Sequence, residues 1–153
     1  MDSLDQKILA IVQKDCTLKA EAIAETVGLS TSAVQRRPRA LRGAGVIRAE
    51  IAVVDPRAIS GMMTFIAGLE IGRENYEALE RLRQWADASD HIQQLYYVTG
   101  NFDLIAIILA QDVGTYDAIT AALMRDNPLI SRITTNVVLR AEKVGLEVPL
   151  AGA

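Results

Sequence analysis

Hydrophobic residues in the first third of the chain recur at the three-to-four-residue spacing of helices. The first helix is expected to begin at Ser3, which has capping-box spacing with Gln6. A second helix is expected over 20–27, and small Ala24 on it lets another helix approach closely. The two apolar stripes consist of Leu4, Ile8, Ile11 and Val12, and of Ile23, Ala24 and Val27.

The segment that follows has the pattern of a helix-turn-helix. Gly28 can adopt the left-handed conformation that ends one helix, and Ser30 can cap the next. Val34 and Leu41 share one face of this third helix, which is expected to end within 43–45. The opposite face carries Ser32, Gln35, Arg36 and Arg39. Short polar groups, an amide and guanidiniums suit the phosphates and base edges of a DNA major groove.

Pro38 interrupts the third helix on its apolar side. Proline removes the hydrogen bond to the Val34 carbonyl and disfavours helical geometry at Arg37, at a cost of about 3 kcal/mol in a helix interior. The helix is therefore expected either to kink near 34–37 or to have its second half redirected. The first turns, which read most bases in such motifs, survive in both cases, so DNA binding with weakened or altered affinity is the expectation.

Beyond residue 48 the period of the pattern changes. Residues 49–54 predict a strand, and Asp55-Pro56 predicts a turn because proline interrupts strand pairing. The predicted domains are a helix-turn-helix over 1–48, a strand and hinge over 49–61, and a second domain over 62–153.

Alternating and continuous apolar runs predict an α+β fold for the second domain. The expected elements are a strand at 63–71, a helix at 74–88, strands at 92–98 and 103–110, a helix from Asp112 to 126, and a strand at 130–139. The run at 103–110 is almost uniformly apolar, which places it at the centre of the sheet. This order is that of a ferredoxin-like βαββαβ unit. Because two helices can cover only one sheet face, the other is expected to self-associate.

The charge distribution indicates a polyanion contact. Residues 1–50 hold eight basic and six acidic side chains and so carry a charge of +2. Because the net charge of the chain is −3, the remaining residues carry −5. Four arginines crowd into 36–42 without an acid among them, and a basic patch on an acidic protein suggests a dedicated partner such as DNA. Arg37 and Arg42 flank the polar helix face and are candidates for phosphate contact. For Arg37 an intramolecular ion pair is an equal alternative.

Several other classes of protein receive no support. No apolar run approaches the ~18 residues of a membrane span, and the first residues lack the basic region of an export signal. Cys16 is the single cysteine, which excludes an internal disulfide and fits a reducing cytoplasm. No His/Cys cluster, Ser/His/Asp arrangement or P-loop is present, so no metal, cofactor or catalytic residue is expected.

Six short motifs in order make the chain resemble the Lrp/AsnC family, the leucine-responsive and asparagine-operon "feast/famine" regulators. They are Leu4-Asp5-x-x-Ile8-Leu9, Val27-Gly28-Leu29-Ser30, Ala33-Val34-Gln35-Arg36-Arg37, Gly45-Val46-Ile47, Asp55-Pro56 and Thr99-Gly100-Asn101-Phe102-Asp103. The resemblance covers essentially the whole chain. It implies an N-terminal winged-type helix-turn-helix and a C-terminal ferredoxin-like, ligand-responsive domain. It further implies a sequence-specific transcriptional regulator that dimerises through its sheet and assembles into larger, often octameric, rings.

The same resemblance implies that a small effector, usually an amino acid, binds between dimers near 100–103. Backbone N–H groups of a glycine turn can receive its carboxylate, and Asp103 can accept from its ammonium. The candidate effector residues are Gly100, Asn101, Phe102, Asp103, Thr134 and Thr135. The alternatives are an ordinary hairpin turn and, for Asp103, a turn-capping acid. Many relatives carry Asp where this chain has Asn101, so the choice of effector is expected to differ.

Two other functions compete with this one. One is an enzyme, since sirohaem decarboxylases share the two-module architecture. Their chemistry requires several histidine and arginine side chains around a tetrapyrrole, whereas this chain has only His91, which is expected to be a hydrogen-bonded surface histidine. The other is an oligomeric amino-acid-binding module whose DNA-binding half has decayed, with Pro38 as the sign.

Overall fold

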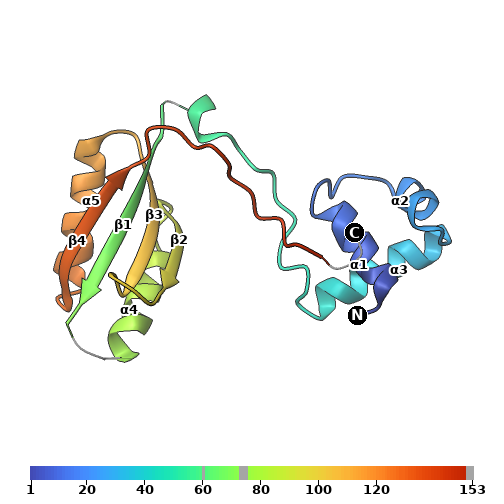
Figure 1. The fold of residues 1–153 in the computed structure, drawn as a ribbon, viewed down its shortest axis with the longest axis horizontal. Coiled ribbons are helices and arrows are strands. Elements are labelled where there is room, and N and C mark those ends of the chain that lie inside the picture. Colours follow the sequence, from blue (N-terminus) through green and yellow to red (C-terminus); the bar gives the residue numbers. More distant parts are fainter. Residues whose placement is uncertain (60, 73–75, 151–153) are drawn as a thin grey trace. The chain divides into compact units, whose positions relative to one another are not determined.

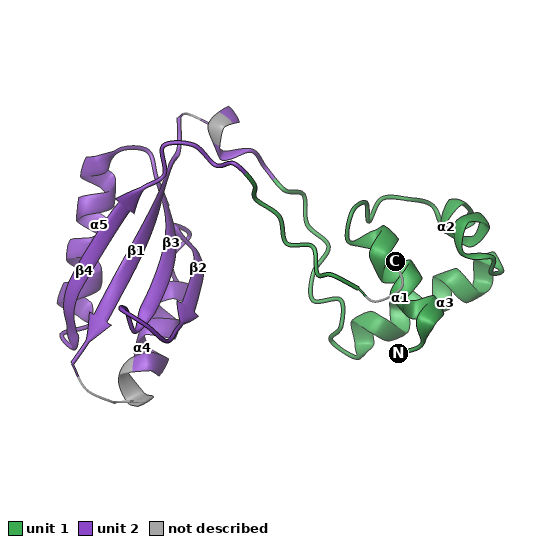
Figure 2. Cartoon of the chain, in the orientation of Figure 1, with its two compact units in different colours: residues 1–53, 143–153 green, residues 54–142 purple. Residues whose placement is uncertain are grey.

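The computed structural model describes residues 1–59, 61–72 and 76–150, which form two compact units (Figures 1 and 2). Unit 1 comprises Met1–Val53 together with Lys143–Ala153, and unit 2 comprises Val54–Glu142. The C-terminal segment from Lys143 therefore groups with the N-terminal helices. Gln13 holds it there, since its amide donates to the Val148 carbonyl at 3.1 Å and accepts from the Val148 N–H at 3.0 Å.

Unit 1 contains three helices: α1 (Ser3–Val12), α2 (Ala20–Val27) and α3 (Thr31–Gly43). Their buried core consists of Ile8, Ile23, Ala24 and Val34. The predicted capping box is wrong by one residue, because Asp2 is the cap of α1: its carboxylate accepts from the Asp5 N–H at 2.8 Å, and the Asp5 carboxylate accepts from the Asp2 N–H at 2.9 Å. Two carboxylates at a helix N-terminus satisfy free N–H groups and complement the helix dipole.

The turn into α3 agrees with the prediction. Gly28 is left-handed, with φ of 70°, and the Ser30 hydroxyl accepts from the Ala33 N–H at 3.3 Å. The helix continues through Pro38 to Gly43, and the proline ring is buried on the same face as Val34. Pro38 therefore contributes apolar surface to the core in addition to removing one backbone donor.

The prediction of a strand at 49–54 is wrong for the single chain. These residues form extended chain that pairs with no other part of the described structure, and Ile51 and Val53 are 64% and 84% exposed. A strand needs a neighbour for its backbone hydrogen bonds, and an apolar run by itself does not supply one. A short 3-10 helix, η1 (Pro56–Ala58), follows.

Unit 2 is a four-stranded antiparallel sheet with two helices, in the predicted βαββαβ order (Figure 1). The elements are β1 (Met63–Ile71), α4 (Tyr76–Asp87), β2 (Ile92–Tyr97), β3 (Leu104–Ala110), α5 (Val113–Asp126) and β4 (Ile130–Val137). The strands lie in the order β2-β3-β1-β4, so β3 is central, as predicted. The predicted start of α4 at Glu74 lies outside the described residues. Asp112 caps α5, as predicted, by accepting from the Thr115 N–H at 2.6 Å.

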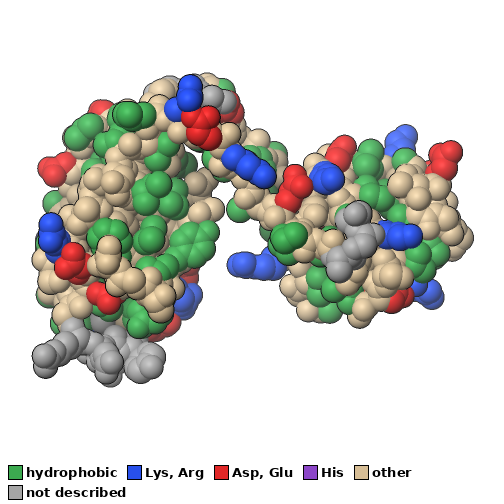
Figure 3. All heavy atoms as spheres, viewed as in Figure 1, with side chains coloured by type: hydrophobic (Ala, Val, Ile, Leu, Met, Phe, Trp, Pro, Cys, Tyr) green, Lys and Arg blue, Asp and Glu red, His purple; other side chains and the backbone are tan. Residues whose placement is uncertain are grey.

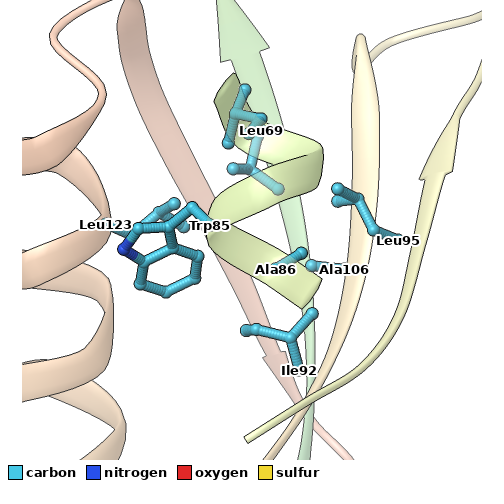
Figure 4. A pocket seen from close by; sticks show the side chains of 8 residues that line it. Leu69, Trp85, Ala86, Ile92, Leu95, Ala106 and Leu123 are labelled. Carbon is cyan, nitrogen blue, oxygen red and sulfur yellow. The ribbon is translucent and has the colours of Figure 1, made fainter. Parts of the chain in front are cut away.

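Both helices pack on one face of the sheet. The buried core under them includes Phe65, Ala67 and Leu69 of β1 and Leu104, Ala106 and Ile108 of β3. Figure 4 shows Trp85 and Ala86 of α4 near Leu69, Ala106 and Leu123, around a narrow gap lined only by apolar side chains. This gap belongs to the core and offers no polar group to a ligand.

Within the described residues of unit 2, no helix packs on the opposite face of the sheet. Alternation along the strands places Ile66 of β1, Ile105, Ile107 and Leu109 of β3, and Tyr96 of β2 on this side. We call this set the uncovered sheet face. Its isoleucines and its leucine are half-buried and Tyr96 is 49% exposed. Hydrophobic side chains, drawn in green, gather over the strands of unit 2 in the space-filling view (Figure 3).

Candidate nucleic-acid interface and effector loop

The polar face of α3 is exposed. Ser32, Gln35, Arg36 and Arg39 are all exposed, whereas Val34, Pro38 and Leu41 are buried. The Ser32 hydroxyl lies 3.2 Å from the hydroxyl of the cap Ser30. Among the described residues, no acid forms an ion pair with Arg36 or Arg39. Two guanidiniums and an amide are therefore presented to solvent on one side of a capped helix.

Arg37 does not belong to that exposed face. Its Nη1 donates to the Asp2 carboxylate at 2.8 Å and to the Asp5 carboxylate at 2.6 Å, and its side chain is 23% exposed. Of the two alternatives predicted for Arg37, the structure shows the intramolecular ion pair. The Asp5 N–H and then Arg37 hold the pKa of the Asp2 carboxyl below its ordinary value, and the Asp2 N–H and then Arg37 lower the pKa of Asp5. The α1 cap and α3 are thus joined by charge.

Arg42 also has an acidic partner. Its Nη2 lies 2.6 Å from a carboxylate oxygen of Glu50, and the two side chains are 46% and 35% exposed. The predicted phosphate contact of Arg42 stays a prediction, and the sequence pattern does not indicate this ion pair. Exposed ion pairs contribute little to stability, so a phosphate can replace Glu50 at small cost.

Residues 98–103 connect β2 and β3 as a hairpin, with the turn that the sequence predicts over 99–101 at its tip. The Val98 N–H donates to the Asp103 carbonyl at 2.9 Å across its base, and Gly100 has φ of 124°. Gly100 and Asn101 are exposed. Their backbone can approach a ligand, which is what the predicted effector contact requires.

Asp103 is committed to the sheet. Its carboxylate accepts from the Ile71 N–H at 2.7 Å, and its own N–H donates to the Leu69 carbonyl at 3.0 Å. This is the alternative of a capping acid, with one oxygen already used by the backbone of β1. The adjacent Phe102 is half-buried.

Thr134 and Thr135 do not face the same site. Thr134 pairs with Gly68 and lies on the uncovered sheet face, whereas the next residue points to the helix side. There the Thr135 hydroxyl is 2.6 Å from the Tyr116 hydroxyl, and the Tyr116 ring stacks on Phe65 with centroids 4.1 Å apart. Burial raises the pKa of Tyr116. The structure therefore takes Thr135 away from the other candidate effector residues, whereas Thr134 lies on the uncovered sheet face beside Gly68.

His91 is a hydrogen-bonded histidine, as predicted, with Nδ1 at 2.9 Å from the Leu109 carbonyl. In the part of the chain that the structure describes, no three His, Cys, Asp or Glu side chains are grouped to hold a metal ion. Over the same residues, no helix has the length and apolar character needed to cross a membrane.

Sequence reasoning missed two residues of this region. Asp2 was overlooked because Ser3 is also a good cap, although Asp2 and Asp5 have the capping-box spacing too. Gly68 was overlooked as part of the apolar alternation of β1, although an isolated glycine in a strand signals a close approach of another group.

Two family comparisons decide what this architecture is. Residues 1–42 match the AsnC-type helix-turn-helix domain, and residues 64–147 match the Lrp/AsnC ligand binding domain. The chain belongs to the Lrp/AsnC family. It is therefore a DNA-binding transcriptional regulator with a small-molecule-binding domain.

Individual Lrp/AsnC relatives match along nearly their whole length. The uncharacterised HTH-type transcriptional regulator y4tD of Sinorhizobium fredii is 34% identical over 98% of this chain and 89% of its own. The transcriptional regulator AzlB of Bacillus subtilis is 27% identical over 98% and 96%. The crystal structure of an AsnC family regulator from Agrobacterium tumefaciens superposes with a TM-score of 0.88 at 28% identity, covering 97% of each chain. The regulator NMB0573 of Neisseria meningitidis, solved with L-Met, shares the fold with a TM-score of 0.88 at 22% identity, covering 99% and 97%.

Proposed function

We propose that the protein reads a specific DNA sequence by placing the exposed face of α3 in the major groove. The supporting observation is the pairing of Arg37 but not of Arg36 or Arg39: the helix is anchored by one arginine and presents two others. Arginine recognises guanine edges, and Gln35 can recognise adenine. Ser32 and Arg42 are proposed to contact phosphates, and Arg37 to hold α3 against α1.

Shift assays with genomic fragments, followed by titration of the selected operator, test this interface. Arg36→Gln and Arg39→Gln should each weaken specific binding by about 1–3 kcal/mol if they contact bases, whereas a phosphate contact mainly lowers the salt slope by about 1. Arg125→Gln, an exposed arginine of α5, is the matched control and should leave affinity unchanged. Absence of any salt-sensitive specific complex, with or without amino acids, would overturn the assignment and favour a module without DNA binding.

The effector is proposed to be an amino acid that binds at the hairpin 99–103. Gly100 and Asn101 are exposed, the backbone N–H groups of such a turn can receive a carboxylate, and NMB0573 was solved with L-Met. Asn101 is neutral, so the preferred amino acid is proposed to differ from that of relatives with Asp there. A thermal-shift screen over the twenty amino acids identifies it, because a ligand of the native state raises the melting temperature.

The proposed partner for the uncovered sheet face is a second copy of the chain. A half-buried row of Ile66, Ile105, Ile107 and Leu109 on a side without helices is the kind of surface that pairs with itself. Such dimers are proposed to assemble further, up to an octamer, and to work on DNA in the cytoplasm. In this scheme residues 1–48 bind DNA, residues 49–61 connect the two domains, and residues 62–153 bind the effector and form the contacts between copies of the chain.

A further inference from the structure

A glycine in the middle of β1 makes room for the effector hairpin. A Cβ built on Gly68 would lie 2.7 Å from Cγ, Cδ1 and Cδ2 of Phe102, a separation that real Cβ atoms essentially never show. Ala67 and Leu69 point into the helix-covered core, so this side of Gly68 belongs to the uncovered sheet face. The Phe102 ring therefore lies flat against the backbone of a central strand, in space that only glycine leaves open.

Two hydrogen bonds fix the next residue of the hairpin to the same strand. The Asp103 N–H reaches the Leu69 carbonyl, and its carboxylate receives the Ile71 N–H. Phe102 and Asp103 together hold the hairpin to the last four positions of β1. Gly100 and Asn101 remain exposed beyond these anchors.

The geometry points to a positioning role for Phe102 and Gly68: the Phe102 ring fits against the glycine, and this contact, which we call the ring-and-notch pair, holds the 99–101 backbone in place for the effector. Phe102 and Asp103 are thus positioning residues and not effector ligands. This inference rests on the proposed amino-acid site at the hairpin. It leaves ligand contact to Gly100 and Asn101. Because Gly68 pairs with Ile105 and Thr134 on either side, the ring over it also joins the hairpin to the uncovered sheet face.

A double-mutant cycle in the full-length protein tests the pair. Gly68→Ala places a methyl group 2.7 Å from carbons of the Phe102 ring, so the hairpin must move. Affinity for the effector should then fall about tenfold or more, the size of an overpacking penalty. Phe102→Ala should also weaken binding, but Gly68→Ala added to Phe102→Ala should cost nothing further, because the methyl then occupies empty space. Gly72→Ala on the same chain segment is the matched control, since its Cβ would lie 4.0 Å from the Leu129 carbonyl oxygen, an ordinary contact.

The probe is L-methionine, measured by calorimetry, or the amino acid that most raises the melting temperature if L-methionine does not. Hydrogen exchange of a peptide spanning 98–104 is followed in parallel and needs no ligand. Gly68→Ala should raise exchange there severalfold only while Phe102 is present, and Phe102→Leu should restore part of the protection that Phe102→Ala loses.

The outcomes separate this inference from the proposed function. Equal costs of Gly68→Ala in the wild-type and Phe102→Ala backgrounds, in binding or in exchange, would overturn the ring-and-notch pair. If the wild-type protein binds none of the twenty amino acids, the proposed effector site is wrong, and the exchange cycle still decides whether Gly68 and Phe102 hold the hairpin.

Discussion

At the scale of single residues, side chains in α3 with the same chemistry have different surroundings. Arg36 and Arg39 are exposed, while Arg37 between them is held by Asp2 and Asp5. A helical step of about 100° per residue carries Arg37 off the outer face, toward the N-terminus of α1. One arginine therefore supports the interface that the other two form.

The ion pairs of Arg37 predict a pH dependence for unit 1. Because folding lowers the pKa of Asp2 and Asp5, their stabilisation is present above the unfolded carboxyl pKa and is lost as pH falls through the folded values. Acidification below about pH 4 should therefore lower the protection factors of the amides in 3–43, taken against the intrinsic exchange rate at each pH, and Asp5→Asn should flatten this dependence. Glu25→Gln, exposed on α2, is the control. A pH profile that Asp5→Asn leaves unchanged would contradict the prediction.

Substitution of Pro38 should raise the stability of unit 1 and the affinity for the operator. Replacement by isoleucine restores the donor to the Val34 carbonyl and keeps an apolar side chain on the buried face, so unit 1 should be stabilised by roughly 1–3 kcal/mol. Operator affinity should rise as well, because α3 regains at its centre the hydrogen bond that Pro38 removes. Trp85, the single tryptophan, lies in unit 2, so unfolding of unit 1 is best followed by exchange in 31–43. Unchanged stability and affinity would show that the proline is already accommodated.

At the scale of elements, hydrogen-bonding partners decide what an apolar run becomes. The run at 104–110 lies between two strands and forms β3, whereas 49–54 has no neighbour in the described chain and stays extended. Likewise, the βαββαβ order places both helices on one side, and this leaves Ile105, Ile107 and Leu109 of β3 facing away from them.

The scale of the whole molecule concerns assembly. The two helices of unit 2 lie on one face of its four-stranded sheet and leave the other face without them, which is the physical ground for the proposed dimer. Unit 1 is basic relative to the acidic remainder, which suits it to DNA. Assembly of several copies would bring several such units together and raise their effective concentration at an operator.

If copies of the chain associate through the uncovered sheet face, a charge placed on that face should give a monomer. Ile107→Asp introduces a carboxylate at its centre, so the oligomer should dissociate at concentrations where the wild type stays associated, as light scattering after size exclusion would show. Val113→Asp is the matched control, because Val113 is exposed at the first turn of α5 where a carboxylate is favourable. An oligomer that survives Ile107→Asp would place the interface elsewhere.

The sequence by itself determined most elements of this protein, the strand expected at 49–54 being the exception. Helix and strand periods, the Gly28 turn, the Ser30 and Asp112 caps and the βαββαβ order all depend on residues within a few positions of one another, and such local hydrogen bonds and stripes can be recognised along the chain. Recognition of the family rests on the same short motifs.

Only the tertiary structure decided which side chains meet. The partners of Arg37, the choice of Thr135 over Thr134 to face the helices, and the Phe102 ring over Gly68 join positions about thirty or more residues apart or depend on strand register. A shift of one residue in register reverses every side chain of a strand, and several arrangements of distant charges satisfy the same pattern. Contacts of this kind follow from packing, which a one-dimensional pattern does not specify.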